Sequence, residues 1–249
     1  MEICIDSVMS GRHAITGGAT RLEVCSVIIE GGLTPSVGFF QFVSRMSLIP
    51  CYAMLRARPG NFIYTKNEIE IMLSDLKALK KSDADGFSFG ALTPDGDIDI
   101  EACRLVLAAA SPLPVNFHRA FDQVRDPIRS LRILIDLGFK RVMTSGHKNT
   151  AEEGLKLIKK LVDEAKDKII VVAASGITKD NILKIHSESG VKEFHSSASR
   201  KMEIERNKVK VGFSESNYVM ATDKKLVQTM VDAYPVPEEP RHTLLPKLT

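Results

Sequence analysis

Short apolar runs alternate with longer amphipathic segments along most of the chain. The runs are rich in β-branched residues and too short for helices, which is typical of strands. We predict eight strands: Glu2–Asp6, Arg21–Ser26, Cys51–Arg56, Gly86–Gly90, Val115–Arg119, Arg141–Ser145, Ile169–Ala173 and Lys192–Ser197.

The segments between the runs carry the start signals of helices. Thr65 and Glu68 form a capping box ahead of an apolar helical face, and Thr150 and Glu153 repeat the pattern. Thr178 is predicted to begin a further helix. Alternating strands and helices imply parallel pairing with right-handed crossovers.

The number of these units predicts the fold class. Eight of them within 249 residues favour an α/β fold closed as an eight-stranded parallel TIM (β/α)8 barrel. The alternative is an open doubly wound sheet, but no Gly-x-Gly-x-x-Gly follows the first strand. We predict a single barrel domain over residues 1–234, with a charged loop or lid at 201–210 and a last helix over Asp223–Ala233. The proline-rich tail, 235–249, is expected to be irregular.

Composition narrows the classes of partner. The net charge of +3 is spread along the chain, which is not the electrostatic footprint of a nucleic-acid-binding protein. No apolar run approaches the ~20 residues that would cross a membrane. Acidic residues stand near the N-terminus, where a signal peptide would need basic ones. We therefore expect a cytoplasmic protein with reduced thiols.

Strand alternation predicts an unusually polar barrel lumen. The faces expected to point inward carry Glu2, Cys4, Asp6, Arg21, Glu23, Cys25, Asn116, His118, Glu193, His195 and Ser197. Buried charges must pair or bind something, because isolating them costs several kcal/mol. Glu2, Glu23 and Glu193 lie near strand starts, so a purely structural hydrogen-bonded network there is as good an interpretation as a functional one.

Functional groups of a barrel are expected at the carboxyl ends of its strands. The candidate catalytic residues are His118, Arg119 and Asp122: histidine as acid or base, arginine as a fork for an anion, and the aspartate orienting either one. A ring of structural ion pairs is the alternative. Candidate ligand-binding residues are Asp6, Arg56, Arg58, Ser145 and His195, although a lone barrel histidine is more often a core residue.

Two cysteines are the candidate metal ligands. Cys4 and Cys25 lie on neighbouring predicted strands and on the same inferred face, where two thiolates can bracket one soft cation such as Cu(I). The alternative is that both are small buried apolar residues.

Seven ordered motifs resemble the CutC copper homeostasis family over residues 1–198. They are Glu2–Ser7, Gly17–Ser26, Glu30–Ser36, Phe117–Asp122, Thr144–Gly146, Ser175–Thr178 and Glu193–Ala198. The resemblance implies a cytoplasmic homo-oligomeric barrel linked to copper, with Cys4 and Cys25 at the positions of the family's candidate Cu(I) ligands. It implies no particular reaction.

Three functions remain open from the sequence. The first is Cu(I) binding through Cys4 and Cys25, with copper as the bound ion. The second is a metal-independent enzyme in which the barrel-top arginines hold a small carboxylated or phosphorylated anion. The third is a non-catalytic partner protein, because Asn61 and Ala173–Ser175 depart from the family's motifs.

Overall fold

A closed barrel of eight parallel strands forms the centre of the molecule, as predicted. The structure is a computed structural model that describes residues 1–203 and 218–234. The strands follow one another around the barrel in chain order, and β8 pairs with β1. They are β1 Glu2–Ile5, β2 Arg21–Val24, β3 Cys51–Met54, β4 Gly86–Phe89, β5 Val115–Phe117, β6 Arg141–Thr144, β7 Ile170–Ala174 and β8 Glu193–Ser196.

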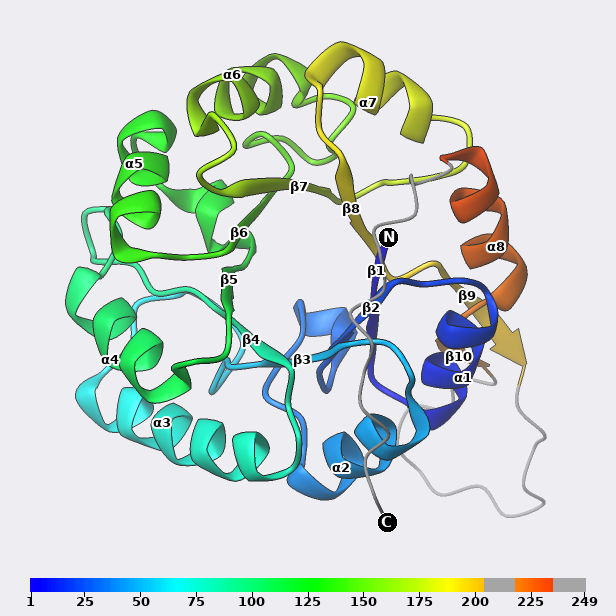
Figure 1. Cartoon of the computed structure of the whole chain (residues 1–249), viewed down its shortest axis with the longest axis horizontal. Helices are drawn as coiled ribbons and strands as arrows, with labels where there is room; N and C mark the ends of the chain where they lie inside the picture. Colours follow the sequence, from blue (N-terminus) through cyan, green and yellow to red (C-terminus); the bar gives the residue numbers. More distant parts are fainter. Residues whose placement is uncertain (204–217, 235–249) are drawn as a thin grey trace.

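Helices surround the barrel as an outer ring (Figure 1). They are α1 Val8–Thr16, α2 Val37–Met46, α3 Lys66–Lys81, α4 Ile100–Ala110, α5 Pro127–Leu137, α6 Leu155–Ala165, α7 Ile182–Ser189 and α8 Lys224–Ala233. Two short 3-10 helices, η1 Ile28–Glu30 and η2 Arg119–Gln123, follow β2 and β5. Helix α8 contacts both α7 and α1, so it completes the ring.

Alternation along each strand separates an apolar layer from the polar lumen. Outward residues such as Ile3, Leu22, Phe87 and Phe194 are fully buried beneath the helices. The strand register places Glu2 opposite Arg21 on β2 and His195 on β8. The sequence pattern that makes the outside of the sheet apolar therefore brings the charged side chains together inside.

Several predicted boundaries differ from those observed. The capping box of Thr65 and Glu68 is confirmed at the start of α3. Thr150 accepts a hydrogen bond from the Glu153 N–H, but α6 begins only at Leu155, after a turn. Helix α7 begins at Ile182 rather than at Thr178, whose N–H instead donates to the Asn181 side chain.

The segment after β8 contains an antiparallel hairpin that the sequence pattern did not predict. Strand β9, Ser199–Glu203, pairs with β10, Tyr218–Thr222, and the last helix then begins at Lys224. The prediction of a loop from residue 201 is therefore wrong for residues 201–203. Its remainder, 204–210, and the predicted irregular tail, 235–249, lie outside the described residues.

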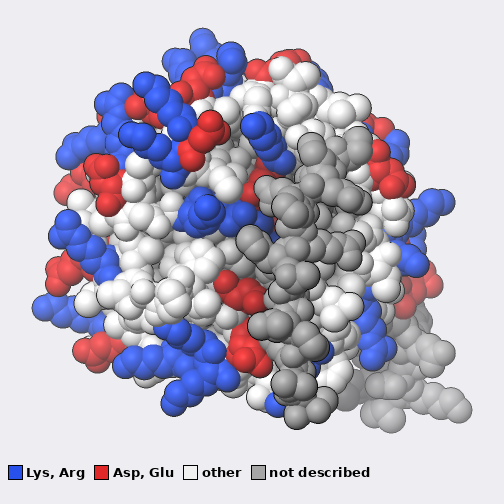
Figure 2. All heavy atoms as spheres, in the orientation of Figure 1, with Lys and Arg blue, Asp and Glu red and all other residues white. Residues whose placement is uncertain are grey.

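The charged surface is mixed in sign. Figure 2 shows lysine and arginine side chains distributed around the rim of one barrel face with acidic side chains between them. Among the described residues, no helix combines the length and hydropathy needed to span a membrane.

Candidate functional site

A cavity of about 830 Å³ opens among the loops that follow the barrel strands. Its walls include seven of the predicted site residues: Cys4, Cys25, Arg56, His118, Arg119, Asp122 and His195. The cavity volume falls within the range of about 300–1,000 Å³ typical of small-molecule sites. Strand carboxyl ends are also where barrel proteins place their functional groups.

Three sulfur-containing side chains meet at one wall of this cavity. Cys4 from β1, Cys25 after β2 and Met54 from β3 form a buried cluster separate from the main core, with Ile28 packed against them. Cys4 is 9% exposed and Cys25 1%. The Cys25 thiol donates to the Ile5 carbonyl oxygen at 3.4 Å. The arrangement brings two thiols and a thioether together in one cluster at the cavity wall.

The loop after β2 is folded so that it covers these sulfurs. The Asp6 carboxylate accepts from the Ile28 N–H at 3.2 Å and so positions η1. Gly32 has a φ of +83°, and a Cβ there would lie 3.3 Å from the Met54 methyl and 3.4 Å from the Cys25 sulfur. A glycine is required because the backbone passes directly over the two sulfur side chains. Asp6 therefore supports the loop instead of pointing a free carboxylate at a ligand.

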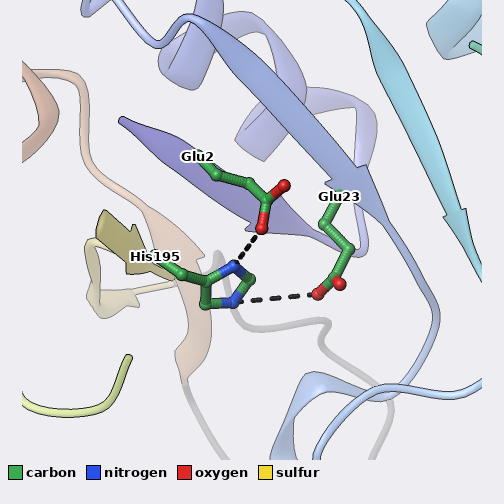
Figure 3. A group of neighbouring side chains, drawn as sticks. All are labelled: Glu2, Glu23 and His195. Atoms are coloured by element: carbon green, nitrogen blue, oxygen red, sulfur yellow. Dashed lines mark hydrogen bonds and ion pairs between the residues drawn. The ribbon is translucent and has the colours of Figure 1, made fainter. Parts of the chain in front are cut away.

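His195 lies between two carboxylates, those of Glu2 and Glu23 (Figure 3), and is also next to Cys4. Its Nδ1 lies 2.7 Å from Oε1 of Glu2, and its Nε2 lies 3.7 Å from Oε2 of Glu23. Burial alone would lower the pKa of His195, but the adjacent Cys4 sulfur and the two glutamates outweigh it and raise the pKa well above its usual value. The raised pKa favours the imidazolium form of His195, next to the two glutamates and Cys4.

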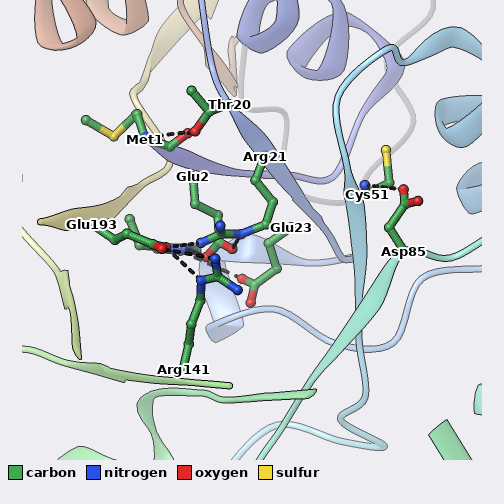
Figure 4. A network of polar contacts seen from close by, with 10 residues as sticks. Met1, Glu2, Thr20, Arg21, Glu23, Cys51, Asp85, Arg141 and Glu193 are labelled. Atoms are coloured by element: carbon green, nitrogen blue, oxygen red, sulfur yellow. Dashed lines mark hydrogen bonds and ion pairs between the residues drawn. The ribbon is translucent and has the colours of Figure 1, made fainter. Parts of the chain in front are cut away.

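Near the strand starts, two arginines pair with the carboxylates of Glu2 and Glu193 (Figure 4). Arg21 donates to Glu2 and, at 2.7 Å, to Glu193. Arg141 binds both oxygens of Glu193, at 2.7 and 3.0 Å. Burial would raise the pKa of Glu2, but Arg21 and His195 hold it well below its usual range. This part of the lumen is a structural ion-pair network, the alternative that the sequence left open.

Glu2, Glu23 and His195 also lie close enough together to hold a metal ion. Both oxygens of Glu2 are already engaged, by Arg21 and His195, and the imidazolium would repel a cation. Burial raises the pKa of Glu23, which further weakens this group as a metal site. These three residues satisfy one another's charge, so the sulfur cluster is the better candidate for a metal.

His118 and Asp122 do not form an acid–base pair. The His118 Nδ1 accepts from the Ala120 N–H at 3.1 Å. Asp122 instead accepts from the Thr144 hydroxyl at 2.6 Å, from the Ser145 N–H at 2.9 Å and from Arg119 Nε at 2.9 Å. Asp122 and Ser145 therefore tie η2 to the end of β6, and Asp122 orients Arg119 rather than the histidine.

The terminal guanidinium nitrogens of Arg56 and Arg58 donate to other groups of the protein. Arg56 is 5% exposed and donates to the carbonyl oxygens of Glu30, Gly32 and Gly60. Arg58 pairs with the capping-box residue Glu68 and also donates to loop carbonyls. Arg119 is the more accessible of the three, with 44% of its side chain exposed. The arginines therefore hold loops together, which weighs against an anion clamp.

Two residues of the site were missed by the sequence analysis. Met54 shares the luminal face of β3 with Tyr52, and applying strand alternation there would have placed it beside the thiols. Arg141 begins β6 and is the main partner of Glu193, which only the strand order around the barrel brings close.

Comparison with known proteins places the chain among copper homeostasis proteins. The profile of the CutC family matches residues 1–200. A mouse copper homeostasis protein cutC homolog is 46% identical over 237 residues, covering 92% of this chain and 87% of its own. The human homolog is 50% identical over 198 residues, covering 80% and 72%.

Solved structures agree on the fold. The CutC protein of Streptococcus agalactiae superposes with a TM-score of 0.76 at 32% identity, covering 79% of this chain and 97% of its own. An aldolase with a TM-score of 0.61 is only 11% identical, over 80% of this chain and 90% of its own, so it shows the shared barrel alone.

Proposed function

The chain belongs to the CutC family of copper homeostasis proteins, and on that premise we propose that it binds Cu(I) through Cys4 and Cys25. The observation that carries the proposal is the buried cluster of Cys4, Cys25 and Met54 at the cavity wall. Thiolates and thioethers are the soft ligands that Cu(I) prefers, and copper is here the cargo rather than a resident cofactor.

The charges around the two thiols bear on the proposal. His195, whose pKa is raised, lies beside Cys4. Burial and the neighbouring Cys4, Glu23 and Asp6 raise the pKa of Cys25, so this thiol keeps its proton until a cation arrives. Binding of Cu(I) therefore displaces a proton from Cys25 and offsets the repulsion between the two sulfurs.

The strand register favours a shared metal over a disulfide. Cys4 is paired with Glu23, so Cys25 lies two residues further along the neighbouring strand. A strand spacing of ~4.8 Å and a rise of ~3.3 Å per residue put the two Cα atoms roughly 8 Å apart. Disulfides rarely form beyond about 7 Å without backbone movement. The two thiols are thus held as a separated pair that one ion can bridge.

Membership of the CutC family also supports proposals on location, assembly and domain extent. We propose that the protein acts in the cytoplasm, as a homo-oligomer and as one barrel domain through residue 234. The alternative of an anion-binding enzyme is disfavoured because the terminal guanidinium nitrogens of Arg56 and Arg58 donate to protein groups.

Anaerobic Cu(I) titration against a chromophoric chelator tests the proposal. We expect about one Cu(I) per chain, with affinity reduced at least ~100-fold in Cys4→Ser and in Cys25→Ser. Cys103→Ser is the matched control, because Cys103 is fully buried on α4 and outside the cavity wall. Equal affinity in the wild type and both site variants would exclude these ligands.

A further inference from the structure

A buried hydrogen-bond donor at the cavity has no partner in the described part of the chain. His118 is 3% exposed, and its ring lines the cavity. Because Nδ1 accepts from the Ala120 N–H, the proton of the neutral imidazole is on Nε2. Nε2 makes no hydrogen bond to any described residue. Buried donors are nearly always satisfied, so this one requires an explanation.

The ring of His118 is fixed in place. It packs against the Phe62 ring, with 5.0 Å between centroids, and the Arg56 guanidinium lies over the same phenylalanine. On another side is Gly90, where a Cβ would come within 2.6 Å of the ring. A donor held this rigidly has a defined direction, which is what recognition of a single acceptor atom needs.

His118 is also held neutral. Burial, together with the charge of Arg56, lowers its pKa to about 3. A neutral imidazole at a helix start donates its N–H without giving up the proton, and barrel enzymes use such a group to polarise a carbonyl oxygen. The preferred partner is therefore an oxygen acceptor rather than a metal or a base.

A second buried polar group lies on the same cavity. Glu23 is 3% exposed and lines the cavity, with the Ser88 side chain within hydrogen-bonding reach of its carboxyl group. The cavity thus offers a fixed donor and a second polar group within a volume of about 830 Å³ that suits a small organic molecule.

We infer that the barrel mouth binds a small organic molecule through a carbonyl or carboxylate oxygen that accepts from Nε2 of His118. This site goes beyond the proposed Cu(I) function and uses different side chains on the same cavity. Ordered water is the competing partner for Nε2, and the experiment separates the two.

Histidine-selective ¹⁵N NMR on the full chain tests the inference with two probes. Hydroxyacetone offers a ketone, and acetate offers only a carboxylate. We expect at least one of them to shift the Nε2 proton of His118, and its affinity to fall at least ~10-fold in His118→Phe, which keeps an aromatic ring in place. His186→Phe is the matched control, since His186 lies on α7 outside the cavity wall.

Two results would overturn the inference. One is that neither probe moves the His118 resonance of the wild type, which leaves water as its partner and needs no variant to fold. The other is equal probe affinity in His118→Phe. Cu(I) affinity is expected to be unchanged in His118→Phe, so failure here and failure of the copper proposal are distinguishable.

Discussion

The Nδ1 atom of His195 lies 2.7 Å from Oε1 of Glu2, which joins the last strand of the barrel to the first. The same carboxylate binds Arg21, and Arg21 reaches Glu193. Closure of the barrel therefore depends on a buried charge network as well as on β1–β8 backbone pairing.

Removing the Glu2 carboxylate should destabilise the fold strongly. Glu2→Gln leaves Arg21 and His195 buried without the negative charge that they pair with. Breaking a buried ion pair in this way costs about 3–5 kcal/mol. Urea unfolding measures the change in the free energy of unfolding. Glu164→Gln is the control, because it breaks an exposed pair with Arg132 and should lower the free energy of unfolding far less. Similar losses in both variants would show that the Glu2 network adds no special stability.

Gly90 should matter because it makes room for His118. A Cβ at residue 90 would lie 2.6 Å from the ring, so Gly90→Ala should destabilise the protein by about 1–3 kcal/mol. In a His118→Ala background most of that loss should disappear, because the clashing ring is gone. A double-mutant cycle by chemical denaturation measures the coupling, and additive losses would contradict the packing described here.

The neutral state of His118 predicts a pH dependence of stability. Its folded pKa is lowered to about 3 from an unfolded value near 6.5, so the unfolded state binds the proton first as the pH falls. The stabilisation from the neutral ring is present above about pH 6.5 and is lost below it. Relative to His118→Phe, the wild type should lose roughly 1 kcal/mol per pH unit between pH 6 and pH 4. Parallel stability profiles would mean that His118 titrates normally.

Local sequence patterns predicted the fold and the positions of the two thiols. Strand alternation placed Cys4 and Cys25 on one luminal face, and their joint packing with Met54 follows from that face. Helix starts at Thr150 and Thr178 were set too early because a capping pattern also occurs in isolated turns.

Partners of the polar side chains were not predictable in the same way. Asp122 pairs with Arg119, Thr144 and Ser145, and Arg56 binds carbonyls of two separate loops. These contacts depend on how the loops after different strands pack together. Nothing in the spacing of residues along the chain encodes that packing directly.

X-ray absorption at the copper edge, on protein loaded anaerobically with Cu(I), tests the central claim most directly. We expect the copper in the wild type to be coordinated by sulfur only, from Cys4 and Cys25, with Met54 as the adjacent third sulfur. A first shell of nitrogen and oxygen would place the ion on His195 and the glutamates instead, and would contradict thiolate binding.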